Sequence, residues 1–222
     1  MNDCPLPWRE TGYGHVVQLA IDHVLIPVDD LTAAAAIVEA RYGLTSIEGG
    51  RHPAWGTANR VVPLGDAYVE LVAVIDRDAA AASTFGRWIL GATPGQPLGW
   101  AVRTRAIADV AQRLGLSIAE GSRTTPGGDA LRWRTTGLDE AVAEPGLPFF
   151  IEWADGVRLP GATPIHHPIG DVRLRRLSLA VDPARVGHWL GQNELPLSLK
   201  QGRAGVVSVV LGHGEHEFAI RI

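Results

Sequence analysis

Residues 49–76 read GGRHPAWGTANRVVPLGDAYVELVAVID, and the alternation near their end decides how the chain folds. Successive side chains of a β-strand point to opposite faces, so Tyr68, Glu70 and Val72 share one face of a predicted strand at residues 67–75. The neighbours of Glu70 are apolar, so its carboxylate points towards an enclosed surface. An unpaired buried carboxylate is costly, and Glu70 is therefore predicted to be neutralised, paired with a base or bound to a metal. The preceding sequence offers as partners Arg51, His52, Asn59 and Arg60.

Composition and charge narrow the classes of function. The chain has 222 residues, of which 46% are hydrophobic and 20% charged, as is typical of a globular protein with ample core. The formal net charge is -4 and no dense Lys/Arg cluster occurs, which argues against nucleic-acid binding. No apolar run reaches the length of a membrane span, and the first residues lack the features of a secretory signal. Cys4 is the only cysteine, so a cytoplasmic location without disulfides is expected.

A pattern of one strand, one helix and three strands recurs along the chain. Each predicted helix begins after a capping residue and ends at a glycine; the caps are Asp29 or Asp30, Thr104 and Asp182, and the glycines are Gly43, Gly115 and Gly191. Their roughly even spacing is typical of a structural repeat. We expect an irregular leader at residues 1–16, paired βαβββ modules at 17–158, a Pro-rich linker at 159–171 and a third βαβββ-like unit at 172–222.

Five blocks of sequence carry a resemblance to a known family. They are IDHVLIPVDDL (21–31), GGRHPAWGTANR (49–60), YVELVAVID (68–76), GSRTTPGGDALRW (121–133) and LPFFIEW (147–153). In this order they resemble the glyoxalase-like domain family of the vicinal oxygen chelate superfamily, which includes glyoxalases, extradiol dioxygenases and bleomycin-resistance binding proteins. The resemblance implies an α+β fold in which two βαβββ modules form a cupped half-barrel. The third βαβββ-like unit adds to them and is expected to pack on the linker or on a second chain.

The same resemblance implies a metal site. In the superfamily the first and fourth strands of each module hold the metal, which here corresponds to His23, Glu70 and Glu152. The fourth position falls at residues 98–100, which offer no ligand. One histidine and two carboxylates suit a divalent Zn, Mn, Fe or Ni ion. The alternation independently puts Ile21, His23 and Leu25 on one face of the first strand, and Phe150 and Glu152 on one face of the last.

Other interpretations of these residues remain open from sequence. His23 is also consistent with a hydrogen-bonded core histidine, and the two glutamates with salt bridges to Arg60 or Arg132. His52 is a candidate base or replacement ligand, and it is equally a loop residue packed on a tryptophan. The candidate substrate-binding residues are His52, Trp55, Asn59, Trp100 and Arg123; Arg123 could instead be a solvated turn residue.

Three functions are consistent with these features. The first is a metal-dependent lyase or isomerase that acts on a small vicinal-oxygen substrate through a stabilised enolate, with Glu70 and His52 as the catalytic residues. The second is a metal-free protein that binds and sequesters a small apolar molecule. The third is an assembly unit, since the third repeat has no fourth to pair with and a homodimer is one expectation.

Overall fold

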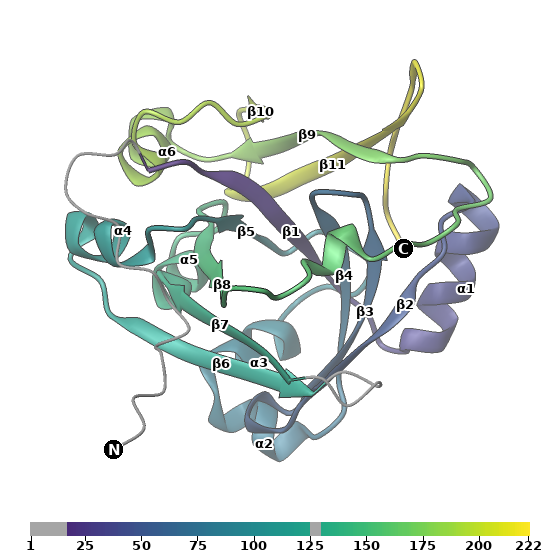
Figure 1. Cartoon of the computed structure of the whole chain (residues 1–222), viewed down its shortest axis with the longest axis horizontal. Coiled ribbons are helices and arrows are strands. Elements are labelled where there is room, and N and C mark those ends of the chain that lie inside the picture. The colour runs from purple at the N-terminus through teal and green to yellow at the C-terminus, as the bar shows by residue number, and fades with distance from the viewer. Residues whose placement is uncertain (1–16, 125–129) are drawn as a thin grey trace.

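Two consecutive βαβββ modules form the main body of the protein. The computed structural model describes residues 17–124 and 130–222 (Figure 1). The elements of the first module are β1 (Ala20–Pro27), α1 (Leu31–Tyr42), β2 (Ile47–His52), β3 (Thr57–Pro63) and β4 (Tyr68–Val74). Those of the second are β5 (Gly99–Arg103), α4 (Ile107–Leu114), β6 (Ile118–Thr124), β7 (Ala130–Thr136) and β8 (Phe149–Trp153). The predicted α+β architecture of paired modules is confirmed.

The eight strands of the two modules form one curved sheet. Their order is β2-β3-β4-β1-β5-β8-β7-β6, so the modules join through the antiparallel pair β1–β5. Within each module the first strand runs parallel to the fourth, as in β1–β4 and β5–β8. The sheet nearly closes, because the side chain of Arg123 on β6 donates a hydrogen bond to the backbone oxygen of Gly49 on β2. The inner face of the sheet is therefore largely enclosed.

Local signals in the sequence set the helix ends. Asp30 caps α1 by accepting hydrogen bonds from the backbone nitrogens of Thr32 and Ala33, and Gly43 ends the helix at a φ of 62°. Asp182 caps the last helix in the same way, whereas the side chain of Thr104 accepts from Ala106 just before α4. In the part of the chain that the structure describes, no helix is both long and apolar enough to cross a membrane.

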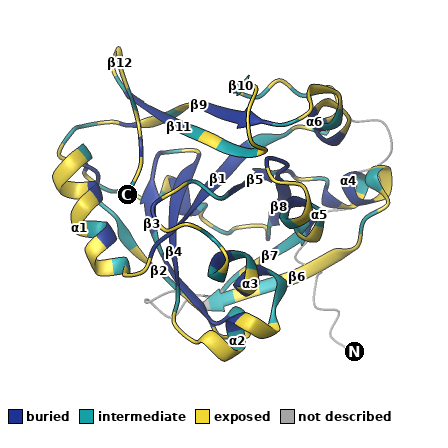
Figure 2. Cartoon of the chain, turned by 180° about the vertical axis from the view of Figure 1, so that it is seen from behind, coloured by how far each residue is buried: buried dark blue, intermediate teal, exposed yellow. Residues whose placement is uncertain are grey.

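Different elements cover the two faces of the sheet. The outer face packs against α1, α4 and the C-terminal unit, and its buried side chains include Val24 and Leu71. Two short helices pack on the inner face, α3 (Thr84–Leu90) and α5 (Leu138–Ala143), and α2 (Arg77–Ala82) packs against α3. A single turn of 3-10 helix, η1 (Pro53–Trp55), contacts α2 and α3. Figure 2 shows that β1, β4 and β5 at the centre of the sheet are largely buried, whereas β6 at one edge is exposed along much of its length.

The C-terminal unit has the predicted order of elements but a different pairing of strands. It consists of β9 (Arg173–Ala180), α6 (Pro183–Leu190), β10 (Leu197–Leu199), β11 (Gly205–His213) and β12 (His216–Ala219), in the sheet order β10-β9-β11-β12. Its first strand runs parallel to its second strand, whereas in the two modules the first strand runs parallel to the fourth. The unit is therefore βαβββ in sequence order without being a third copy of the module.

The C-terminal unit shares the core of the paired modules. Trp189 on α6 is 2% exposed, stacks near Phe150 of β8 and donates a hydrogen bond to the backbone oxygen of Pro148. The predicted linker at residues 159–171 also packs on the first module, where the His167 ring bonds to the Thr45 nitrogen and the Pro63 oxygen. Since one hydrophobic cluster spans both parts, they are expected to unfold together.

Ile220→Val tests this shared core. Ile220 is fully buried between the C-terminal sheet and the modules, so loss of one methylene is expected to lower the free energy of unfolding by about 0.5–1.5 kcal/mol. Urea unfolding followed by circular dichroism and by tryptophan fluorescence should show one shifted transition. Val207→Ala, at a side chain 41% exposed, is the control and should change stability by less than about 0.5 kcal/mol. Two separate transitions, with only one shifted, would contradict the shared core.

Candidate functional site

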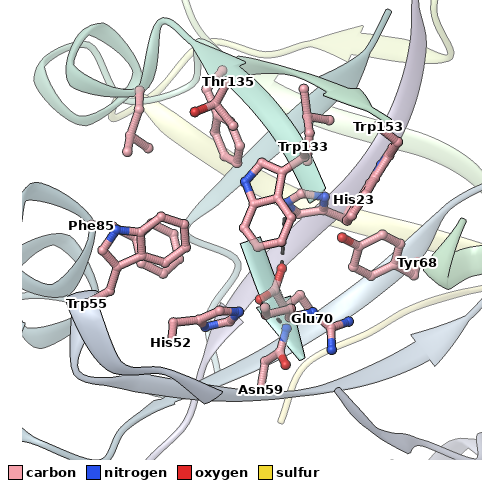
Figure 3. Close-up of a pocket in the computed structure, with 14 residues that line it drawn as sticks. His23, His52, Trp55, Asn59, Tyr68, Glu70, Phe85, Trp133, Thr135 and Trp153 are labelled. Carbon is pink, nitrogen blue, oxygen red and sulfur yellow. Dashed lines mark hydrogen bonds and ion pairs between the residues drawn. The ribbon is translucent and has the colours of Figure 1, made fainter. Parts of the chain in front are cut away.

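A pocket opens on the inner face of the eight-stranded sheet, beneath the short helices. Its aromatic lining consists of Trp55, Tyr68, Phe85, Trp133, Phe149 and Trp153. Its polar lining consists of His23, His52, Asn59, Glu70, Arg123 and Thr135. Figure 3 shows the polar groups gathered around Glu70, with aromatic rings on either side. The structure thus brings together six of the predicted site residues: His23, His52, Trp55, Asn59, Glu70 and Arg123.

Glu70 lies at the centre of the polar groups, as its position on β4 predicts. Glu70 is 6% exposed, and Asn59 on the neighbouring strand donates a hydrogen bond of 2.6 Å to Glu70 Oε1. Its other oxygen, Oε2, lies 3.6 Å from His23 Nε2. Asn59 and His23 therefore hold the carboxylate from two sides and fix its orientation in the pocket.

His23 is in turn held by a carboxylate that the sequence analysis missed. The register of β1 against β5 shifts between Ile21 and His23, so Asp22 and His23 both lie towards the pocket, while Ile21 packs in the outer core. The expectation that Ile21 shares a face with His23 is wrong for this reason. Asp22 Oδ1 bonds to His23 Nδ1 at 2.8 Å, and Asp22 Oδ2 accepts from Trp153 Nε1 at 3.0 Å.

Asp22 remains ionised despite complete burial. Burial alone would raise the pKa of its carboxyl, but the hydrogen bond and charge of His23, with the charge of Arg103, outweigh it and lower the pKa. Arg103 Nη1 lies 3.1 Å from Asp22 Oδ2. The charged Asp22 therefore favours a proton on His23 Nδ1 and leaves Nε2 facing Glu70 and the pocket.

Tyr68 completes this side of the pocket. Its ring stacks on the imidazole of His23 with centroids 4.7 Å apart. Burial, followed by the negative charges of Asp22 and Glu70, raises the pKa of the Tyr68 hydroxyl well above its ordinary value. Tyr68 therefore keeps its proton, and its hydroxyl is hydrogen-bonded to Asp22.

His52 lies on the pocket wall formed by the end of β2. It is 7% exposed, its Nδ1 lies 3.2 Å from Thr57 Oγ1, and its ring is 5.2 Å from that of Trp55. Burial lowers the pKa of His52; the charge of Glu70 acts in the opposite direction, and Arg123 adds to the lowering. His52 is therefore neutral at neutral pH and able to accept a proton.

The lowered pKa of His52 makes stability depend on pH. The unfolded chain has the ordinary histidine pKa of 6.5 and binds a proton that the folded form resists, so stability falls as pH drops below that value. Urea unfolding midpoints measured from about pH 5 to about pH 8 should show a weaker fall for His52→Gln than for wild type. His188→Gln, at an exposed histidine on α6, should keep the wild-type slope. Equal slopes in wild type and His52→Gln would contradict the assignment.

Glu152 does not share the pocket with His23 and Glu70. It projects from the opposite face of β8, where Arg134 on β7 forms an ion pair with its Oε2 and the backbone nitrogen of Ile107 lies 3.4 Å from its Oε1. Phe150 lies on that same outer face, while Phe149 and Ile151 face the pocket. The predicted pairing of Phe150 with Glu152 is correct, but the shared face is the outer one. Glu152 has the salt-bridge role, with Arg134 as partner in place of Arg60 or Arg132.

Trp100 is also absent from the pocket. It is fully buried in the outer core, and its Nε1 donates a hydrogen bond of 2.9 Å to the backbone oxygen of Gly146. The other face of β5, which includes Ala101, packs in the inner hydrophobic cluster. The structure thus assigns Trp100 a packing role and does not support its predicted contact with substrate.

The side chains of the site do not fit the expected three-ligand metal centre. His23 Nε2 and Glu70 Oε2 are close enough to share one ion, but Glu152 lies across the sheet. The second module faces the pocket with Phe149 and Ile151, which carry no donor. Within residues 17–124 and 130–222, no group of three or more His, Cys, Asp or Glu side chains is arranged to hold an ion. Catalytic metal sites generally have three protein ligands, so a firmly held ion does not match this donor set.

Comparison with known proteins agrees with the fold. The sequence pattern of a glyoxalase-like domain matches residues 21–194. A hypothetical protein from Staphylococcus aureus has a similar structure, with a TM-score of 0.66 and 14% identity over 87% of this chain and 90% of that chain. Methylmalonyl-CoA epimerases from Mycobacterium tuberculosis and Streptomyces coelicolor match less well. Their TM-scores are 0.45 and 0.47, their identities 18% and 19%, and the matches cover 60% and 64% of this chain and 86% and 99% of those chains. No curated protein matches the sequence.

Proposed function

Because the chain belongs to the glyoxalase-like domain family, we propose that it is an enzyme of the isomerase or lyase type that moves a proton on a small carbonyl compound. The observation that carries the proposal is the line of ionisable groups Asp22, His23 and Glu70, of which His23 and Glu70 line an aromatic pocket and Asp22 lies behind His23. A pocket for passive binding of an apolar molecule does not need two buried carboxylates, which are costly to enclose.

In the proposed reaction, Glu70 takes a proton from the carbon next to the substrate carbonyl. Asn59 holds Oε1 of the carboxylate, and Oε2, which lies 3.6 Å from His23 Nε2, takes the proton. The enolate oxygen that develops accepts a hydrogen bond from Arg123, which lines the same pocket. Neutral His52, on another wall, is placed to accept or return a proton at a neighbouring atom.

Asp22 positions His23 in this scheme. Asp22 accepts a hydrogen bond from His23 Nδ1, and this bond keeps the Nε2 atom directed at Glu70 Oε2. Metal dependence is left out of the proposal, because Glu152 belongs to the outer face and only two of the three expected ligands are present.

The lining of the pocket also favours a second candidate, the sequestration of a small apolar molecule. Trp55, Trp133 and Trp153 form a continuous row, with ring centroids 6.3 and 5.6 Å apart. Such a row binds a planar ligand whether or not chemistry follows. The two functions differ in one readout, since only the enzyme exchanges a carbon-bound hydrogen of the ligand with solvent.

A screen for hydrogen exchange tests the proposal. Small ketones and hydroxyketones are incubated with the protein in deuterated water, and loss of the carbon-bound proton signal is followed by NMR. Binding is followed in parallel by quenching of tryptophan fluorescence. The proposal predicts exchange above the uncatalysed rate for at least one compound that binds. Saturable binding without exchange across the series would favour sequestration instead.

A further inference from the structure

The pocket is closed on one side by elements inserted between the strands of the modules. Phe85 from α3, Leu138 from α5 and Trp55 from η1 line this side. Figure 3 shows Trp55 and Phe85 on one side of Glu70, with Tyr68 and Trp153 on the other. The ring centroids of Trp55 and Phe85 are 4.9 Å apart, so the two rings form a continuous apolar wall.

Close backbone contacts hold this wall in place. A Cβ added to Gly86 on α3 would lie 2.4 Å from the backbone oxygen of Ala80 and 2.6 Å from that of Trp55. A Cβ added to Gly56, which has a φ of 63°, would lie 2.2 Å from the backbone oxygen of Asp76, the residue that caps α2. Since η1, α2 and α3 meet through backbone atoms, the wall cannot move back to admit a longer ligand without displacing all three.

The space in front of the wall has two chemically different ends. One end presents the flat faces of Trp55, Phe85 and Trp133, which favour a planar ring. The other presents Glu70 and Arg123, which favour an oxygenated group.

We infer that the substrate carries a single planar ring joined by a short arm to its carbonyl, and that Phe85 and Leu138 set the limit on its length. The inference rests on the proposed proton transfer, because the carbonyl must reach Glu70 while the ring lies against the wall. Extended substrates are excluded by the side chains of α3 and α5, which cover the inner face of the sheet. The two residues are thus specificity-determining and take no part in the chemistry.

A series of three ketones tests the length limit. Acetone has no ring, phenylacetone has one and 4-biphenylylacetone has two; each exchange rate in deuterated water is divided by the uncatalysed rate. For the wild-type protein, the normalised kcat/KM for phenylacetone is expected to be at least about tenfold higher than the values for acetone and for 4-biphenylylacetone. Differences of this size are usual when an apolar pocket binds or excludes one group. Leu138→Ala and Phe85→Leu are expected to raise the value for 4-biphenylylacetone by about tenfold. Leu199→Ala, at a side chain 39% exposed on β10, should change none of the three.

The outcomes separate this inference from the proposed function. Equal normalised exchange of all three ketones would overturn the length limit and leave proton transfer standing. Selective binding of phenylacetone, measured by fluorescence, without exchange would support the one-ring ligand and overturn the enzyme. Both pocket variants are checked by circular dichroism, and Phe85→Leu is chosen because it keeps most of the buried volume. Failure of both folded variants to admit 4-biphenylylacetone would overturn the role of Phe85 and Leu138.

Discussion

Glu70→Gln is expected to lower kcat for hydrogen exchange by about 10²–10⁴-fold, the usual contribution of a general base. Ligand affinity should stay within a few-fold of wild type, because glutamine has the same shape and its oxygen can still accept the hydrogen bond from Asn59. The measurement is exchange by NMR at saturating ketone, with the dissociation constant taken from tryptophan fluorescence. A loss of kcat without a loss of binding is the signature of a group that acts on the reacting proton.

Glu39→Gln is the matched control for this variant. Glu39 lies exposed on α1, outside the pocket, so the same chemical change there should leave kcat and binding at wild-type values. If Glu70→Gln exchanges hydrogen as fast as wild type while it binds the ligand, Glu70 is not the base. If it fails to bind, the carboxylate serves recognition, and the assignment of a catalytic role is wrong.

Glu152→Ala is expected to lower the free energy of unfolding by about 3–5 kcal/mol, because it removes one partner of a largely buried ion pair. The side chains of Glu152 and Arg134 are 8% and 19% exposed, so the pair is largely removed from solvent. Exchange activity per folded molecule should stay unchanged, since Glu152 lies on the outer face of β8. Urea unfolding gives the first quantity and NMR exchange the second.

Glu217→Ala supplies the comparison for Glu152→Ala. Glu217 forms an ion pair of 3.2 Å with Arg176, and the two side chains are 45% and 46% exposed. An exposed pair of this kind contributes about 0–1 kcal/mol, so this variant should remain nearly as stable as wild type. A stable Glu152→Ala protein that has lost exchange activity would contradict the structural role of Glu152 and return it to the site.

The position of Glu70 was predictable because its strand alternates cleanly. Tyr68 and Glu70 line the pocket, while Val69 and Leu71 face the outer core. The same reasoning failed one strand away, at Asp22. Asp22 can contact His23 because the register shifts between β1 and β5. Such an irregularity arises from the pairing of strands that are distant in sequence, so the residues around Asp22 do not reveal it.

The face occupied by Glu152 could not be read from its own strand. Four of the five residues of β8 are buried, so alternation separates the residues into two sets without showing which set faces the pocket. What distinguishes the sets is Arg134 on the neighbouring strand, which forms the ion pair with Glu152. A carboxylate on a doubly covered strand is therefore weaker evidence for a ligand than one on a strand with a known inner face.

The pairing of the C-terminal unit was unpredictable for a similar reason. The cap at Asp182 and the glycine at 191 mark its helix as clearly as in the modules. Strand pairing, however, depends on which edge is free once the unit packs on the outer face of the sheet. Here β9 pairs with β10 and β11, and not with β12, which is the fourth strand of the C-terminal unit. Local signals determined the elements, and long-range packing determined their neighbours.

The central claim is that Glu70, held by Asn59 and His23, transfers a proton without a firmly bound ion. The most direct measurement is hydrogen exchange by the purified protein in excess chelator, with its metal content determined by elemental analysis. We predict that exchange by wild type is unchanged by the chelator and is lost in Glu70→Gln. Exchange that stops with the chelator and returns when Zn, Mn, Fe or Ni is added would contradict the account.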